Sequence, residues 1–456
     1  MKRLTWLIVG VIVLIALTLR LHQFKNRTPF DWDQNRDYGE VVKIASGQYI
    51  PLGPIAKGTS GGFYLGSLYY YALAPTYMLM DGAVSSLPIT SIVIDALVAG
   101  LLYLLLYKPL GKKRSLLLAV MWTCTWFLIE WSRVSWNVAL VPLWSLLTLY
   151  ALYESIEYKS VRHFYLLALL AGLTIHIHVA TIPVIPLLLI IFLKRLHFPL
   201  RVWIQGVTLS ITPAIPLLLY DMGHGFSNLH LLKDFLHFHG QVQTPWNEMV
   251  IVMLTKLGKV VSGIFVSVFR DNIWLGLITL ILALKSLWNK NTVVRLAGAM
   301  VVISSLLVVF LRDPGFPEYY LAPAYLALCI VFLNALFNLF PRRLQTIVYV
   351  CVAACIYLNL SAYTTETTGF SLAVKEQIVE SLKVYEHPID INYTFDPGRE
   401  GGLKYLVNDA GIQLDPKSKT RVIITDKLNT PLYIDGELAR DLTQIGNLRT
   451  ALYIVQ

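Results

Sequence analysis

The amino-acid sequence predicts an α-helical polytopic membrane protein with about 11 transmembrane helices and a small extracytoplasmic α/β domain at its C-terminal end. Apolar residues make up 56% of the chain and charged residues only 14%, whereas soluble domains contain about 25% charged residues. The net charge of +10 is carried by short basic clusters between apolar runs, not by one basic stripe. This distribution is typical of topology signals in a bilayer and predicts no nucleic-acid partner.

The first apolar run, from Leu4 to about Leu19, follows Lys2 and Arg3. Such a segment is either a cleaved signal peptide or a first transmembrane helix. We expect a helix, because the run is at the long end for a signal peptide core and no small-residue cleavage site follows it. The N-terminus is then cytoplasmic, because the basic pair precedes the span.

A helix needs about 20 apolar residues to cross the hydrocarbon core, or somewhat fewer with snorkelling flanks. The spans predicted by this rule lie near residues 4–20, 88–107, 115–131, 138–154, 163–176, 179–194, 201–219, 272–288, 294–311, 319–340 and 344–362. The basic clusters between them, such as Lys112 to Arg114 and Arg342-Arg343, then fall on one side. The positive-inside rule identifies that side as the cytoplasm.

Two further segments, Tyr64 to Met80 and Met249 to Phe269, are apolar enough to confuse this count. If only one of them crossed the bilayer, the later basic clusters would change sides. We therefore expect both to be interfacial or re-entrant elements on the outer face, where aromatic rings are favourable. The outer face then carries a first loop over residues 22–88, a second over about 221–271, and the tail after Ser361.

The composition changes at about Thr367, where charge rises and apolar runs shorten to strand length. Strands are predicted at Arg421 to Asp426 and at Leu448 to Gln456, and a short helix at Gly401 to Ala410 that is ended by Gly411. These features divide the chain into a transmembrane domain over residues 1–366 and an extracytoplasmic domain over residues 367–456.

Three carboxylates and an arginine, namely Asp31, Asp33, Arg36 and Asp37, follow the first span directly. Ionisable groups placed against membrane segments are candidates for a functional site. An aspartate in this position could take a proton from an attacking hydroxyl or amine, while nearby cations hold a phosphate leaving group. The alternative is structural, because aspartates also cap and solvate the first turn of a helix.

The order of motifs in the first outer loop resembles the GT-C superfamily of membrane glycosyltransferases. The motifs are Asp33-Gln-Asn-Arg-Asp37, Tyr49-Ile-Pro-Leu-Gly-Pro54 and Gly61-Gly-Phe-Tyr-Leu-Gly-Ser-Leu-Tyr-Tyr-Tyr71. Within the superfamily the chain is similar to the protein-mannosyltransferase and aminoarabinose-transferase type, also called glycosyltransferase family 39-like. The resemblance covers about residues 1–362, is strongest in the first 150, and implies a GT-C fold.

The resemblance implies that Asp33 is the catalytic base. Many relatives have an acid at the next position, where this chain has Gln34, so that a second carboxylate comes from Asp37 or Asp31 or is not needed. Asp31-Trp-Asp33 also matches the short DxD pattern of metal-dependent enzymes that use sugar nucleotides. A divalent metal is therefore possible, but a lipid-monophosphate donor does not require one, and we predict no dedicated metal site.

The predicted substrate-binding residues lie at the outer ends of the spans. They are Arg36, Arg133, Asn137, Arg270, Arg312, Tyr319 and Tyr320. Arg270 and Arg312 are expected to contact the donor phosphate, and Arg133 and Asn137 to orient the substrate. His176 and His178 are two residues apart and would point in different directions on a helix, which disfavours a shared metal ion. The histidine-rich segment from His224 to His239 is expected to be solvated at the interface.

The predicted function is an inverting glycosyltransferase of the cytoplasmic membrane. It would transfer a sugar from a polyprenyl-phosphate donor to a lipid, glycan or protein acceptor on the extracytoplasmic face. Two alternatives remain open: a polymerase or ligase that uses diphosphate-linked oligosaccharides, and a lipid flippase or transporter. A transporter would place charges near the middle of the bilayer, whereas this chain concentrates its polar residues on one face.

Overall fold

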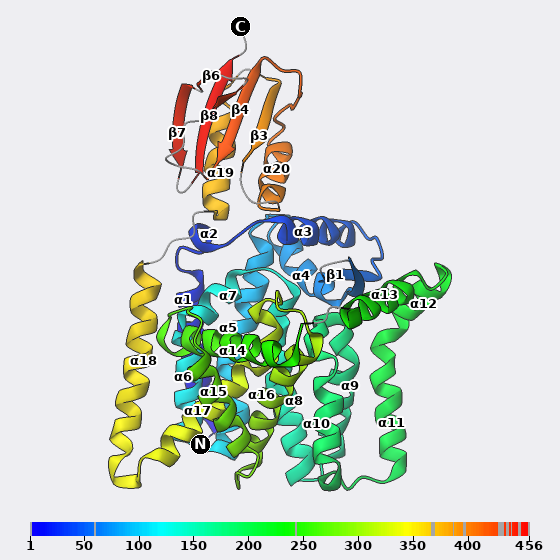
Figure 1. Cartoon of the computed structure of the whole chain (residues 1–456), viewed down its shortest axis with the longest axis vertical. Coiled ribbons are helices and arrows are strands. Elements are labelled where there is room, and N and C mark those ends of the chain that lie inside the picture. The colour runs from blue at the N-terminus through cyan, green and yellow to red at the C-terminus, as the bar shows by residue number, and fades with distance from the viewer. Residues whose placement is uncertain are drawn as a thin grey trace.

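The computed structural model describes residues 2–58, 61–241, 244–365, 370–385, 387–394, 398–426, 433–434, 437–438, 440–445 and 448–454. Upright helices form a bundle, and a small sheet with two helices stands on one end of it (Figure 1). The N-terminus lies at the opposite end, where the α10–α11 and α17–α18 connections with their basic residues also lie. This arrangement agrees with a bundle whose basic turns share one side.

The membrane part consists mainly of helices. They are α1 (Lys2–Leu21), α2 (Phe24–Arg27), α3 (Trp32–Ala45), α4 (Leu68–Leu79), α5 (Ser86–Leu110), α6 (Lys112–Cys124), α7 (Trp126–Arg133), α8 (Val141–Glu157), α9 (Val161–Ile177), α10 (Val184–Phe192), α11 (Leu200–Ile211), α12 (Ile215–Gly223), α13 (Ser227–Gln241), α14 (Trp246–Val266), α15 (Ile273–Ser286), α16 (Thr292–Leu311), α17 (Tyr325–Leu339) and α18 (Gln345–Thr365). Short 3-10 turns connect them at η1 (Asn137–Leu140), η2 (Val179–Thr181), η3 (Leu193–Arg195), η4 (Thr212–Ala214), η5 (Glu318–Ala324) and η6 (Arg342–Leu344).

In the described part of the chain, eight helical segments are long and apolar enough to cross a membrane, or nine if one bent pair is a single span. The chain is therefore an integral membrane protein. Seven of the eight coincide with expected spans, and the bent pair coincides with the expected span 115–131. Three other expected spans contain shorter helices, α9, α10 and α15. The count of about 11 is compatible with this arrangement.

The expected span 115–131 is not one straight helix. It is broken between α6 and α7 with a bend of 58°. At the break Thr125 adopts an extended conformation, and its hydroxyl donates to the Met121 carbonyl at 2.7 Å. The Trp126 amide, which the break frees, donates to Asn359 Oδ1 at 2.8 Å. A side chain from α18 therefore satisfies the backbone where the helical ladder stops, as a buried kink requires.

The segment from Tyr64 to Met80 does not form one element. It begins in a β-hairpin of β1 (Leu52–Gly58) and β2 (Gly61–Gly66), and continues as α4. With 12 residues, α4 is about 18 Å long, too short for a hydrocarbon core of about 30 Å. The segment thus does not span, as expected, but the sequence analysis did not predict the hairpin.

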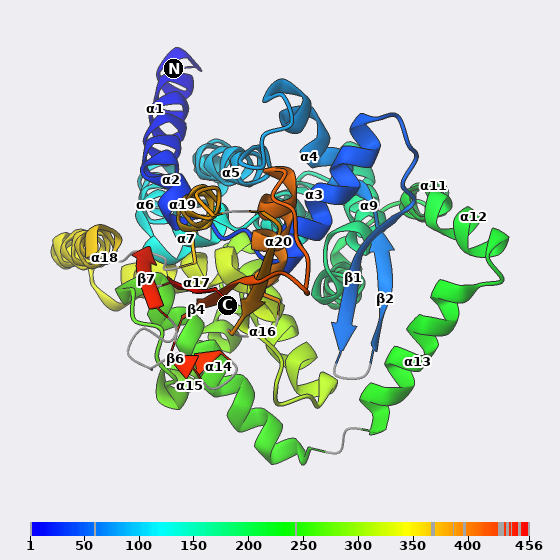
Figure 2. The ribbon, with the colours of Figure 1, turned by 90° about the horizontal axis from the view of Figure 1, so that it is seen from above.

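Helix α14 contains the second doubtful segment. Its length and composition would allow it to span. Both views show α13 and α14 lying across the upright helices instead (Figures 1 and 2). Gly258 of α14 and Gly276 of α15 allow these two helices to touch, because a Cβ at either would meet a backbone oxygen of the other segment within 2 Å. An arrangement across the bundle is what the expected interfacial element requires.

The C-terminal part is a small α/β unit. Its elements are α19 (Leu372–Leu382), β3 (Ile389–Tyr393), α20 (Glu400–Asp409), β4 (Thr420–Thr425), β5 (Tyr433–Ile434), β6 (Glu437–Leu438), β7 (Arg440–Ile445) and β8 (Leu448–Ile454). Four strands form a sheet in the order β3-β4-β8-β7, in which β3 and β4 are parallel and the other pairs antiparallel.

Alternating apolar residues of β3 and β4 pack with α19 and α20 to form a separate core, which includes Ile378, Leu403 and Val422. Helix α20 ends before Gly411, whose φ of +71° is readily accessible only to glycine. The predicted strands and helix are present here, whereas α19 was not predicted. The domain boundary expected at 366/367 lies outside the described residues and stays a prediction.

Candidate functional site

Helix α3 carries the charged motif across the top of the bundle, below the C-terminal sheet (Figure 1). Arg36 bridges two aspartates of the helix. Its Nη1 donates to Asp33 Oδ1 at 2.8 Å, and its Nε and Nη2 donate to Asp37 Oδ1 at 2.8 and 2.6 Å. The side chain of Asp33 is 50% exposed and that of Asp37 is fully buried. Only Asp33 is therefore open to a reactant.

Asp37 is a buried carboxylic acid with a raised pKa. Burial raises its pKa to about 7, although the neighbouring Arg36 guanidinium opposes this shift. Its second oxygen, Oδ2, is buried without a hydrogen-bond partner. The two carboxylates predicted to be catalytic, Asp33 and Asp37, therefore differ in their surroundings: Asp33 is half exposed, whereas Asp37 is buried and paired with Arg36.

The raised pKa of Asp37 predicts a pH dependence of stability. Between its ordinary pKa of 3.8 and about 7, Asp37 is protonated in the folded chain but ionised in the unfolded one. The free energy of unfolding therefore falls as pH rises through this window. From pH 5 to pH 8 we expect Asp37 to contribute a loss of about 3 kcal/mol, at about 1.4 kcal/mol per pKa unit.

Thermal unfolding of wild type and Asp37→Asn in detergent, followed from pH 5 to pH 8, measures this contribution. We expect the wild-type Tm to decline relative to that of the variant as pH rises. Parallel Tm curves for the two proteins would contradict the raised pKa.

The first turn of α3 explains the glutamine at position 34. Gln34 Oε1 accepts from the Asp31 amide at 3.0 Å, which is one half of a capping box. Gln34 Nε2 donates to the Ser135 carbonyl at 3.0 Å. A glutamate could make the first bond but would direct a carboxylate at a carbonyl oxygen. Gln34 therefore links the start of α3 to Ser135, in the segment between α7 and η1. Asp31, the N-cap of α3, pairs with Lys375 of α19.

Aromatic side chains from three segments form a wall of stacked and edge-on rings. Tyr319 and Tyr320 of η5 stack at 5.5 Å, and Trp136 packs edge-on against Tyr319 at 4.9 Å. His178 contacts both tyrosines, at 5.5 and 5.2 Å. Burial is the main cause that raises the pKa of Tyr319, and the negative charges of Asp33 and Glu318 add to it. Asp33 and Tyr319 therefore lie within electrostatic range of each other, although they are far apart in the sequence.

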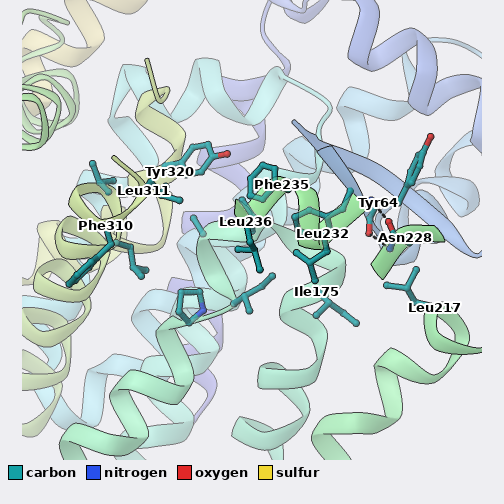
Figure 3. A pocket seen from close by; sticks show the side chains of 17 residues that line it. Tyr64, Ile175, Leu217, Asn228, Leu232, Phe235, Leu236, Phe310, Leu311 and Tyr320 are labelled. Carbon is teal, nitrogen blue, oxygen red and sulfur yellow. Dashed lines mark hydrogen bonds between the residues drawn. The ribbon is translucent and has the colours of Figure 1, made fainter. Parts of the chain in front are cut away.

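Behind this wall lies an apolar cavity of about 570 Å³ (Figure 3). Tyr320, Phe310 and Leu311 line one end of it, and Tyr64 and Asn228 the other. Most other lining side chains are aliphatic or aromatic, from η2, α9, α10, α13 and α16.

Asn228 is not free to bind a ligand, since it exchanges two hydrogen bonds with the backbone of Tyr64 at 2.7 and 3.0 Å. A cavity with this lining suits a hydrocarbon chain.

The structure does not bring Arg133 to this site. Its side chain is fully buried, and its donors bind the carbonyls of Leu19, Arg20 and His22 at 3.0–3.1 Å. It also pairs with Glu130. Arg133 thus completes the C-terminal turn of α1, whose carbonyls have no partners within the helix. The expectation that Arg133 contacts substrate is corrected on this ground.

Asn137, Arg312 and Arg270, which were also predicted to bind substrate, lie in three different surroundings. Asn137 Nδ2 donates to the Ile177 carbonyl at 2.5 Å, and so supports the segment that carries His178. Arg312 donates twice to the Thr244 carbonyl, at 3.0 and 2.8 Å, and lies over the Trp246 ring. In the sequence, Arg312 comes directly after Phe310 and Leu311, which line the cavity. Arg270 is exposed in the connection between α14 and α15.

The two expected histidines do diverge. His176 Nε2 contacts the Pro213 carbonyl at 2.8 Å, and His178 Nδ1 accepts from the Ala180 amide at 3.2 Å. Among the residues that the structure describes, no three His, Cys, Asp or Glu side chains are grouped as metal ligands. Of the histidine-rich segment, His224 stacks on Tyr220, whereas the side chain of His239 lies outside the described residues.

The sequence analysis missed a pair of lysines near the tyrosines. Lys256 and Lys259 of α14 both donate to Glu318 Oε1, at 3.0 and 2.7 Å. Two lysines share one carboxylate, so this group carries an excess positive charge next to Tyr319. Their spacing of three residues places them on one face of a helix, which is the only signal the sequence offers.

Comparisons with known proteins agree with this architecture. Residues 66–220 match the family described as dolichyl-phosphate-mannose-protein mannosyltransferase. The crystal structure of ArnT from Cupriavidus metallidurans bound to undecaprenyl phosphate is similar, with a TM-score of 0.60 and 12% identity over 97% of each chain. ArnT in the apo state gives a TM-score of 0.60 and 11% identity, over 100% of this chain and 99% of ArnT.

No curated protein sequence matches the chain. Identities of 11–12% show a common fold and no more. Together with the match over residues 66–220, this likeness confirms the resemblance that the first outer loop indicates: the chain has the GT-C fold and is similar to membrane glycosyltransferases of the protein-mannosyltransferase and aminoarabinose-transferase type.

Proposed function

We propose that the protein is an inverting glycosyltransferase that moves a sugar from a polyprenyl-phosphate carrier to an acceptor on the extracytoplasmic face of the membrane. The observation that carries this proposal is the half-exposed Asp33 carboxylate, held by Arg36 within electrostatic range of Tyr319, which stacks on Tyr320 in the wall of an apolar cavity. The GT-C fold and the family match support the same reaction class. ArnT has been crystallised with undecaprenyl phosphate, which supports a donor of that class here.

In this reaction Asp33 takes a proton from the acceptor hydroxyl or amine while that atom attacks the anomeric carbon. The bond between the anomeric carbon and the phosphate oxygen breaks, and the polyprenyl phosphate leaves with the electron pair. Attack opposite the leaving group inverts the anomeric centre. A base in the right position contributes about 10²–10⁴-fold to such a step.

Positive groups near Asp33 would stabilise the departing phosphate, whose negative charge grows in the transition state. Arg36 lies against Asp33, and Lys256 with Lys259 adds charge near Tyr319. Arg312 is proposed as a further contact at the edge of the cavity, and Arg270 as a more distant one.

The isoprenoid chain of the donor would occupy the apolar cavity, where it loses its contact with water. Helix α3 with the charged motif, and α13, which contributes to the cavity lining, lie toward the end on which the C-terminal domain stands (Figure 1). The positive-inside rule would assign that end to the outside.

The test is a transfer assay with purified protein and radiolabelled sugars on a panel of polyprenyl monophosphates and diphosphates. We expect transfer from a monophosphate donor, with a product of inverted anomeric configuration. Transfer from diphosphate-linked donors alone would replace the proposal by a polymerase or ligase. Movement of the donor between leaflets without transfer would replace it by a flippase.

A charge in the cavity wall should weaken donor binding. Leu236 lines the cavity on α13, and Leu236→Glu would place a carboxylate against the isoprenoid chain. We expect the KM for a long-chain donor to rise about 10-fold, because a bound isoprenoid chain would cover the carboxylate, which must then be desolvated or neutralised. Steady-state kinetics with long-chain and short-chain donors measures this effect.

Leu229→Glu is the matched control. Leu229 lies on the same helix with a similar exposed fraction, 54% against 61% for Leu236, but does not line the cavity. We expect its KM to stay near that of wild type. An equal change in both variants, or no greater change for long chains than for short ones, would contradict the assignment of the cavity.

A further inference from the structure

A lysine of the C-terminal domain is buried against the start of α3. Lys375 of α19 is 0% exposed, and its Nζ contacts three oxygens: the Phe30 carbonyl at 2.7 Å, the Arg399 carbonyl at 3.2 Å and Asp31 Oδ1. An ammonium has three donors, and here each has an acceptor. Two of the acceptors belong to the segment that begins the charged motif, so the contact joins the two parts of the chain.

Other backbone contacts fix the same segment. The Trp32 amide donates to the Gly398 carbonyl at 3.0 Å, and the Leu372 amide donates to the Thr28 carbonyl at 2.8 Å. Helix α20 packs directly on Phe30, because a Cβ at Gly402 would come within 1.7 Å of the Phe30 carbonyl oxygen. The residues that precede Asp33 are therefore held from the side of the C-terminal domain.

These contacts meet at the residue that starts α3. Asp31 is the N-cap, and Asp33 is the second residue of the helix after it. Asp33 itself is half exposed and has one ion-pair partner, on the same helix. The place of its carboxylate relative to an acceptor is thus set by the first turn of α3, which Lys375 anchors through Asp31 and Phe30.

We propose that Lys375 is a positioning residue for the transfer reaction, through which docking of the C-terminal domain sets the place of Asp33. This inference rests on the proposed function, in which Asp33 is the base. An error of about 1 Å in the place of a catalytic group costs about 10²-fold in rate. Loss of the anchor should therefore lower the rate of the chemical step while the donor site, formed by other elements, is kept.

The test compares Lys375→Met with Glu376→Gln in the full-length protein. Glu376 is the neighbouring residue and also joins the two parts of the chain, by an exposed pair with Lys25 at 2.9 Å, but contacts neither Asp31 nor α3. We expect Lys375→Met to lower kcat 10-fold to 100-fold with KM for the donor changed less than 3-fold. Glu376→Gln should stay within 2-fold of wild type in both, as expected for a surface ion pair.

The rate is divided by the amount of polyprenyl phosphate that the preparation binds, which gives kcat per binding site. Misfolded chains reduce the number of binding sites but leave kcat per site unchanged, whereas a misplaced Asp33 lowers kcat per site. If Lys375→Met does not fold, Asp31→Asn replaces it as the test variant. This substitution is expected to fold, because Asp31 is about one-third exposed and the asparagine oxygen can still accept a hydrogen bond from Lys375. We expect a several-fold loss of kcat per site for Asp31→Asn.

A wild-type kcat per site in the folded variants would overturn the inference. Asp33→Asn, measured beside them, separates the two failures. If Asp33→Asn is inactive while Lys375→Met is fully active, only the positioning role of Lys375 is refuted. If Asp33→Asn is active, the proposed base is wrong.

Discussion

Replacement of Asp33 by asparagine is expected to abolish sugar transfer almost completely while donor binding survives. Asparagine has nearly the same shape as aspartate and can still accept the hydrogen bond from Arg36 Nη1, so the first turn of α3 should be kept. It cannot accept the proton of the acceptor. Since general-base catalysis contributes about 10²–10⁴-fold, we expect kcat to fall by that amount.

The measurement is single-turnover transfer with a saturating donor, together with equilibrium binding of polyprenyl phosphate. Glu40→Gln is the matched control, because Glu40 is a carboxylate on the same helix that pairs only with Lys43, at 2.7 Å, among its described contacts. We expect kcat of Glu40→Gln to be unchanged. Equal activity of wild type and Asp33→Asn would remove Asp33 from the mechanism.

Replacement of Arg36 by methionine is expected to reduce both stability and activity. Arg36 is the ion-pair partner of the fully buried Asp37, and removing one member of a buried pair costs about 3–5 kcal/mol. Asp37 would then bind a proton, because its pKa is already raised by burial and would lose the opposing effect of Arg36. The Tm should fall accordingly. Activity should fall about 10²-fold, since a positive group next to the base and the phosphate is lost.

A double variant separates these two effects. In Arg36→Met/Asp37→Asn the buried carboxylate is gone together with its partner, so most of the lost Tm should return. Activity should stay low, because Asp33 still lacks the guanidinium. The measurements are thermal unfolding and kcat of the single and double variants under the same conditions. Recovery of activity together with Tm would show that Arg36 acts only on stability.

The helices of the bundle and some elements of the C-terminal domain could be predicted from the sequence. The apolar runs predict the helices of the bundle, because crossing a bilayer needs a length of hydrophobic chain that can be read from adjacent residues. The short helix before Gly411 and the strands around Val422 follow from equally local patterns. Asp33 was proposed from its position after the first span, and the structure leaves its side chain the most exposed of the three carboxylates of the motif.

The same motif shows where local reasoning fails. The sequence left open whether Asp31 or Asp37 assists Asp33. In the structure Asp31 is held by a lysine 344 residues away, Asp33 is half exposed, and Asp37 is buried. Arg133 was expected at the substrate because it ends an outer segment. It instead binds the carbonyls that end α1, a contact across more than 100 residues.

The sequence by itself determined that this is a membrane protein of helices with its distinctive charges near one boundary, since hydrophobic length and charge clusters are properties of neighbouring residues. Only the tertiary structure decided which of these charges are exposed, which are buried and which are paired. Burial and pairing depend on what distant segments bring to a site: Lys375 pairs with Asp31, and the Ser135 carbonyl accepts from Gln34. The free energy of a carboxylate is set by those partners and by its exposure to water, and neither is written in the residues next to it.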